Sequence, residues 1–124
     1  MEIFYTKEHD WVKVEGGIGA VGISNYAVKQ LGNITSVELP DVGSEVKQNG
    51  VLCTVESEKA ASDVYAPLSG KVAEVNKELE NSPGIINSSP EGLGWIARIE
   101  ISNPDETGNL MDEEKYGEYL KTLE

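Results

Sequence analysis

The sequence has one cysteine, one histidine and only 10 basic residues against 22 acidic ones. Cys53 has no partner for an intramolecular disulfide, which favours a reducing compartment. No apolar run reaches the roughly 18 residues of a membrane-spanning helix, and Met1–Asp10 is too polar for a secretory signal peptide. These absences predict a soluble, cytoplasmic protein with no membrane partner.

The chain also lacks the patterns of several function classes. A formal net charge of −12 repels phosphate backbones, so nucleic acid is not an expected partner. There is no glycine-rich phosphate loop, no Cys or His pair at metal-ligand spacing and no nucleophilic serine elbow. Neither an enzyme nor a metal site is therefore predicted.

Short apolar segments separated by Gly, Pro and Asn predict a mainly β fold, arranged as a barrel-like sandwich. Glu15-Gly16-Gly17 is typical of a hairpin turn between the first two segments. The expected strands are Trp11–Val14, Ile18–Ile23, Ile34–Leu39, Val51–Ser57, Lys71–Val75 and Trp95–Ile101.

Two segments carry helix signals. The first runs from Ser24, as N-cap, to Leu31, with Gly32 at the C′ position. The second begins at Asp112, and its apolar stripe is expected to contain Tyr116, Tyr119, Leu120 and Leu123. The segment 103–109 between the last strand and this helix is expected to be a loop.

Lys59 is predicted at the tip of a tight β-hairpin. It follows an alternating run in which Val51, Cys53 and Val55 occupy one side and Leu52, Thr54 and Glu56 the other. Small residues follow before the chain extends again through Val64. Taken alone, a lysine at such a tip is most often a solvated charge.

The segment Glu56-Ser57-Glu58-Lys59-Ala60, with Tyr65–Val72 after it, resembles the lipoyl-attachment region of the glycine cleavage system H-protein family. The resemblance covers nearly the whole chain, and the flanking motifs distinguish this family from other lipoyl or biotinyl domains. These motifs, in the family's order, are Tyr5–Trp11 (YTKEHDW), Val21–Gly32 (VGISNYAVKQLG), Val37–Gly43 (VELPDVG), Val75-Asn76, Asn87–Pro90 and Gly94-Trp95.

The resemblance implies a lipoyl/biotinyl-type barrel-sandwich hybrid with short peripheral helices and a C-terminal helix. It implies one lipoyl-carrier domain over residues 1–124. The expected parts are a hairpin core at about 34–77, an N-terminal hairpin and helix within 1–33, and a C-terminal strand and helix within 94–124.

The function implied is that of a non-catalytic carrier, with lipoate joined by an amide bond to Lys59. The carrier would shuttle an aminomethyl group from the pyridoxal-phosphate-dependent glycine decarboxylase to the aminomethyltransferase. Dihydrolipoyl dehydrogenase would reoxidise the dithiol, and a lipoate ligase or lipoyl/octanoyl transferase would attach the lipoate. Successive weak docking favours a monomer.

The resemblance also implies a cleft for the cationic cargo, lined by Glu8, Asp10 and Asp63, although each carboxylate could instead face solvent. His9 is expected to be a structural hydrogen-bonding residue and Cys53 a small core residue. Trp11 and Trp95 are expected to be core or cleft-wall aromatics.

Glu58 departs from the family pattern, which usually has a small apolar residue before the lysine, and looks more like lipoyl domains of 2-oxo acid dehydrogenase complexes. An H-like lipoyl carrier that serves lipoate transfer or another lipoate-dependent pathway is the main alternative. A biotin carrier would have methionines beside Lys59. A structural interaction protein would leave Lys59 unmodified.

Overall fold

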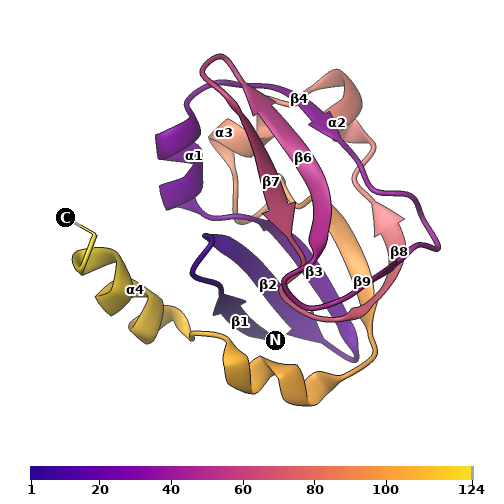
Figure 1. Ribbon diagram of the computed structural model, residues 1–124. Coiled ribbons are helices and arrows are strands. Elements are labelled where there is room, and N and C mark those ends of the chain that lie inside the picture. The colour runs from indigo at the N-terminus through magenta and orange to yellow at the C-terminus, as the bar shows by residue number, and fades with distance from the viewer. Residues whose placement is uncertain (124) are drawn as a thin grey trace.

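The computed structural model describes residues 1–123 and shows two β-sheets with helices around them (Figure 1). The predicted mainly β class is confirmed. Within the described residues the strands are β1 (Glu2–Tyr5), β2 (Asp10–Glu15), β3 (Ile18–Ile23), β4 (Ile34–Glu38), β5 (Glu45–Val46), β6 (Val51–Ser57), β7 (Ala61–Tyr65), β8 (Gly70–Val75) and β9 (Ala97–Ile101).

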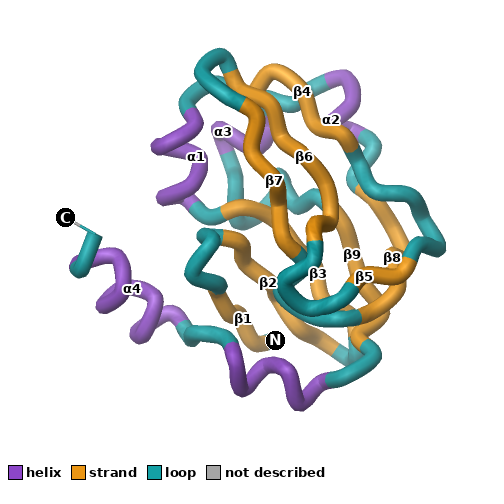
Figure 2. Tube along the Cα trace, in the orientation of Figure 1, coloured by secondary structure: helices purple, strands orange, loops and turns teal. Residues whose placement is uncertain are grey.

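The two sheets are not closed into a barrel. The larger has the strand order β1-β2-β3-β9-β8-β5 and the smaller has the order β4-β6-β7, with antiparallel neighbours throughout. Figure 2 colours these strands orange. The predicted hairpin turn at Glu15-Gly16-Gly17 joins β2 to β3, and both glycines have positive φ. In the smaller sheet, β6 lies between two edge strands and continues into the hairpin that carries Lys59.

The helical segments are α1 (Asn25–Leu31), α2 (Glu78–Asn81), α3 (Ile85–Ser88), the 3₁₀ helix η1 (Pro104–Asn109) and α4 (Glu113–Lys121). Helices α1 and α4 were predicted from their caps. The prediction of a plain loop at 103–109 was wrong, because η1 occupies most of it. The short elements β1, β5, α2 and α3 were not predicted. Residue 124, the last of the predicted C-terminal part, lies outside the described residues.

Both predicted helix N-caps are observed. The Ser24 side chain accepts a hydrogen bond from the N–H of Ala27, and Asp112 accepts one from Lys115. These bonds satisfy backbone donors that a helix N-terminus leaves free. Helix α1 ends at Gly32, where φ is 79°. Glycine adopts this left-handed conformation without the steric cost of a side chain.

The main core lies between the two sheets and is formed by aliphatic side chains. Val55 and Val64 of the smaller sheet and Ile99 of the larger are 0–1% exposed. One detail of the predicted alternation in β6 was wrong: Val51 is 54% exposed whereas Leu52 is buried. The register shifts between Val51 and Cys53 where β6 meets β7, and this bulge turns consecutive side chains toward the core.

A second, aromatic cluster holds α4 against the larger sheet. The rings of Tyr5 and Tyr116 stack with centroids 4.2 Å apart, and Trp11 is 1% exposed beside them. The Tyr116 hydroxyl lies 2.8 Å from Nδ1 of His9 and 2.7 Å from the Ser24 Oγ. His9 is therefore a hydrogen-bonding residue, as predicted.

The predicted apolar stripe of α4 holds for three of its four residues. Tyr116 is buried, and Tyr119 and Leu120 pack partly against the aromatic cluster. Leu123 is 43% exposed, so its inclusion in the buried face was wrong. It lies beyond the end of α4 at Lys121, where the helical periodicity no longer directs its side chain toward the sheet.

Replacing Ser24 by alanine is expected to destabilise the protein by about 1–2 kcal/mol, because the change removes the α1 cap and the hydrogen bond to the buried Tyr116 hydroxyl. Urea unfolding measures the loss. The exposed Ser102, replaced in the same way, is the control and should change the free energy of unfolding little. Equal losses in the two variants would contradict this role of Ser24.

Candidate functional site

Lys59 lies at the tip of the β6–β7 hairpin, which Ser57 ties together. The Ser57 N–H donates to the carbonyl of Ala60 at 2.8 Å. The Ser57 Oγ accepts hydrogen bonds from the N–H groups of Lys59 and Ala60, each at 3.2 Å. Neither Glu58 nor Lys59 has a positive φ. The tip is thus a tight, internally bonded turn rather than a loose loop.

The connection between α1 and β4 supports this tip from the side. The N–H of Glu58 donates to the carbonyl of Asn33 at 3.0 Å, and the Asn33 side-chain amide donates to the Glu58 carboxylate at 3.3 Å. A Cβ atom placed on Gly32 would lie 3.4 Å from Cε of Lys59, so the lysine stem passes close to this glycine. The unusual Glu58 therefore binds the supporting connection.

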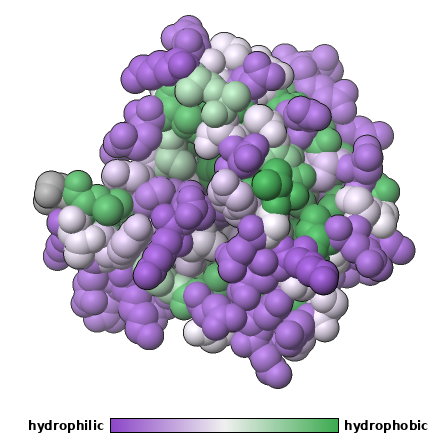
Figure 3. Space-filling model, viewed as in Figure 1, coloured by the Kyte–Doolittle hydropathy of each residue, from purple (hydrophilic) through white to green (hydrophobic). Residues whose placement is uncertain are grey.

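The Lys59 side chain is exposed at the end of the smaller sheet. Figure 3 shows hydrophilic side chains at the top of the molecule, where the hairpin ends. Among residues 1–123 the only salt bridge joins Arg98 to Glu74, so the Lys59 ammonium forms none there. An exposed amine on a bonded turn is accessible to an enzyme that modifies it.

Asp10, at the start of β2, is a buried carboxylate with a 2% exposed side chain. Its Oδ2 accepts a hydrogen bond from the backbone N–H of Tyr65 at 3.2 Å, which connects β2 to the β7 edge. Burial raises the pKa of Asp10 well above its usual value, the nearby Glu8 raises the pKa further, and hydrogen bonds from Tyr65 and Thr6 oppose the shift.

The other two predicted cleft residues are exposed. Asp63 lies on β7 and accepts a hydrogen bond from the hydroxyl of Thr54, its cross-strand partner. Glu8 lies in the turn between β1 and β2. The charge of Glu8 raises the pKa of Asp10, so these two of the three predicted cleft residues lie close enough to interact.

Cys53, on β6, is a buried free cysteine. Burial raises the pKa of its thiol to about 12, and the charges of Asp10, Glu38 and Asp63 add to the shift. At neutral pH the thiol is therefore protonated, and protonated thiols are poor nucleophiles. Cys53 is a small core residue, as predicted.

Asp10→Asn is expected to stabilise the protein more at neutral than at acidic pH. Because the folded pKa of Asp10 is raised, the stability supplied by its protonated form is complete below the unfolded pKa and is lost as pH rises through the folded pKa. Asparagine keeps an oxygen for the Tyr65 N–H but cannot ionise. Urea midpoints of both proteins should diverge as pH rises, and a pH-independent difference would contradict the burial of an ionisable group.

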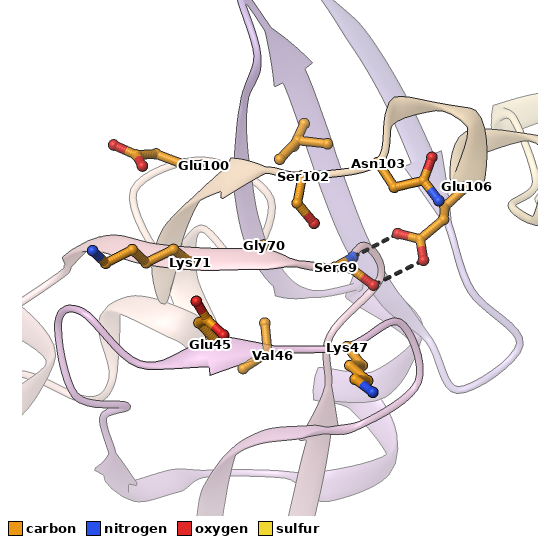
Figure 4. Close-up of a pocket in the computed structure, with 11 residues that line it drawn as sticks. Glu45, Val46, Lys47, Ser69, Gly70, Lys71, Glu100, Ser102, Asn103 and Glu106 are labelled. Atoms are coloured by element: carbon orange, nitrogen blue, oxygen red, sulfur yellow. Dashed lines mark hydrogen bonds between the residues drawn. The ribbon is translucent and has the colours of Figure 1, made fainter.

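A cavity of about 720 Å³ lies elsewhere, between β5, β8, β9 and η1. Figure 4 shows Lys47, Lys71 and three glutamates around it, with Glu106 bonded to the backbone and hydroxyl of Ser69. These elements lie at the other end of the view from the hairpin tip (Figure 1). This cavity is therefore separate from the Lys59 site. Its lining carries both lysines and glutamates, and Glu106 is already bonded to Ser69, so the charges do not indicate one class of ligand.

The part of the chain that the structure describes contains no group of three or more His, Cys, Asp or Glu arranged to hold a metal ion. Over the same residues, no helix is long and apolar enough to cross a membrane.

Trp95, predicted as a core or cleft-wall residue, is half-buried, and the guanidinium of Arg98 lies 3.9 Å from its ring centroid.

Sequence reasoning missed the residues that support the tip. Gly32 was recognised as the end of α1, but nothing local indicated that the lysine stem would lie beside it. Asn33 contacts Glu58 across 25 residues of sequence. Glu91 was also missed: it accepts hydrogen bonds from the Tyr5 hydroxyl and from the N–H of Asn25 at the start of α1. Such contacts have no local sequence signal.

Known proteins resemble the chain over nearly its full length. A family model described as "Glycine cleavage H-protein" matches residues 3–123. The chain is 53% identical to the glycine cleavage system H protein of Xanthobacter autotrophicus, over 96% of this chain and 95% of that protein. It is 57% identical to the probable glycine cleavage system H protein of Pyrococcus abyssi, over 98% and 91% of the two chains.

A solved structure shares the fold as well. The crystal structure of a glycine cleavage system H protein from Mycobacterium marinum superposes with a TM-score of 0.88 and 32% sequence identity, covering 97% of each chain. The similarity therefore extends beyond residues 56–60 to both sheets and the terminal elements.

Proposed function

Since the chain belongs to the glycine cleavage H-protein family, we propose that it carries its cargo on lipoate joined by an amide bond to Lys59. The observation that supports this attachment is the exposed lysine on a turn held by Ser57 and by Asn33. When bound, lipoate supplies the reversible disulfide and dithiol chemistry by which a carrier of this kind accepts and releases an aminomethyl group.

Lys59 fits this group because its amine is accessible and forms no salt bridge among the described residues. Attachment needs the neutral amine to attack the activated carboxyl carbon of lipoate; a C–N bond forms, the amine loses a proton and the activating group leaves. The amide removes one positive charge from the tip. The turn then presents the arm at a defined point, which shortens its search for partner sites.

Glu8, Asp10 and Asp63 are the proposed lining of a cargo cleft. Asp63 is exposed and can face a cationic amine, and Glu8 adds negative charge beside Asp10. Asp10 plays a different part, because it is buried and bonded to the backbone of β7. It would hold β7, the strand that carries Asp63, in place. A cation that approaches closely would favour the ionised form of Asp10.

The proposed partners follow from the family. They are the glycine decarboxylase, the aminomethyltransferase and dihydrolipoyl dehydrogenase, together with a lipoate ligase or lipoyl/octanoyl transferase. The chain is proposed to be non-catalytic and cytoplasmic. It is also proposed to be a monomer, because a carrier that visits several enzymes must leave each of them readily. An H-like carrier for another lipoate-dependent pathway is not favoured, since the relatives named above are described as glycine cleavage system proteins, one of them as probable.

Reconstitution tests the proposal. The lipoylated protein, mixed with the three partner enzymes, tetrahydrofolate and oxidised nicotinamide cofactor, is expected to support release of labelled CO₂ from glycine. The same protein before lipoylation is the matched control and is expected to give background release. Full lipoylation without CO₂ release, under conditions where an established H protein is active, would contradict the role in glycine cleavage.

A further inference from the structure

Asn87, on α3, binds the connection between α1 and β4 at two points. Its Nδ2 donates to the carbonyl of Gly32 at 2.9 Å, and its Oδ1 accepts from the N–H of Ile34 at 2.8 Å. Both residues are more than 50 positions away from Asn87 in the sequence. Asn33 lies between the two bound residues, so the single amide side chain fixes the chain on both sides of it.

Asn87 bonds to the side of β4 that has no neighbouring strand. β4 is an edge strand, and its ladder with β6 ends at the pair Ile34 and Ser57. A backbone N–H at such an edge needs another partner, which Asn87 supplies. Helix α3 is a firm support, because Ile86, the residue before Asn87, is fully buried. Figure 1 shows α1 and α3 close to the end of the β6–β7 hairpin.

The supported connection in turn contacts the hairpin tip. Asn33 exchanges two hydrogen bonds with Glu58, one through its carbonyl and one through its side-chain amide. Gly32 lies beside the Lys59 stem. Asn87 itself contacts neither Glu58 nor Lys59 by these bonds. It bonds directly to Gly32, and it reaches Asn33 only through the two neighbours of that residue, Gly32 and Ile34.

We infer that Asn87 is a positioning residue for Lys59, acting through Gly32 and Asn33 to fix the direction in which the lysine leaves the hairpin. This inference rests on the proposed lipoylation of Lys59. A ligase must align the lysine amine with an activated carboxyl, and alignment is lost when the turn samples other orientations. Removing the Asn87 amide is therefore expected to slow attachment without removing the amine.

Amide hydrogen exchange tests the positioning step without any lipoate. In Asn87→Ala the Glu58 N–H, which donates to Asn33, is expected to exchange about tenfold faster. The Ser57 N–H, which donates to Ala60 inside the hairpin, should keep its rate. Ser88→Ala, an exposed neighbour on α3, is the control and should change neither rate. If Asn87→Ala does not fold, Asn87→Asp, which keeps an oxygen for Ile34 but loses the donor to Gly32, is expected to act in the same direction.

Lipoylation kinetics test the consequence. With a lipoate ligase, kcat/KM for Asn87→Ala is expected to fall about tenfold. Ile99→Val, a core change in β9, controls for a general loss of stability and should keep the wild-type value. An unchanged Glu58 exchange rate, an unchanged kcat/KM, or an equal fall in Ile99→Val would each overturn the inference. If the wild type itself takes up no lipoate, the proposed function fails, and the exchange rates alone then decide whether Asn87 orders the tip.

Discussion

Lys59→Arg is expected to reduce glycine-dependent CO₂ release in the reconstituted system to background while the protein remains folded. Lys59 is exposed at a turn, so its replacement removes no core contact. Arginine keeps the positive charge and a long stem, but its guanidinium stays protonated and does not form the amide. The variant therefore separates the charge of the tip from its ability to carry lipoate.

The matched control is Lys71→Arg, which changes an exposed lysine on β8. This variant is expected to be lipoylated and to keep wild-type activity. Thermal unfolding of both variants should match the wild type, because exposed substitutions of this kind usually change stability by less than about 0.5 kcal/mol. Activity in Lys59→Arg, or its loss in Lys71→Arg as well, would contradict attachment at Lys59.

Gly70→Ala is expected to destabilise the fold by about 3 kcal/mol or more. Gly70 begins β8, where the backbones of β8 and β9 approach closely. A Cβ there would overlap the carbonyl oxygen of Glu100 and would lie 2.5 Å from Cγ2 of Ile99. The nearest obstacle is backbone, so relief requires the two strands to separate, which weakens the ladder between β8 and β9 in the larger sheet.

Gly84→Ala is the control for Gly70→Ala. Gly84 has a helical φ of −62°, and a Cβ there would meet no atom within 4 Å. Because alanine reduces the conformational freedom of the unfolded chain at such a position, this variant is expected to be unchanged or more stable by less than about 1 kcal/mol. Urea unfolding of both variants measures the difference. A similar free energy of unfolding in the two would contradict the close approach of β8 and β9.

The sequence predicted the parts of the fold that have local causes. Ser24, Gly32 and Asp112 act within a few residues of the helix ends that they define, so their signals were sufficient for α1 and α4. The two-residue strand β5 carries too little pattern to be recognised, and it exists because it pairs with β8. The bulge in β6 likewise depends on its register with β7 and cannot be deduced from alternation alone.

The candidate site likewise has features that local sequence predicts and features that depend on distant contacts. The hairpin turn and the position of Lys59 followed from small residues after an alternating strand. The burial of Asp10 did not, because it depends on how β2 meets the end of β7, 55 residues away. The supports at Asn33 and Asn87 also depend on distant contacts. The local pattern thus predicted where Lys59 lies, and the family resemblance identified it as the residue proposed to be modified. Tertiary packing determines how it is held.

The most direct test of attachment at Lys59 is the mass of the intact protein after incubation with lipoate, ATP and a lipoate ligase, followed by fragmentation to locate the added group. The expected result is a single lipoyl increment, found on Lys59 alone. An increment on another lysine would contradict the assignment, as would an unmodified chain under conditions in which a known lipoyl domain is fully modified.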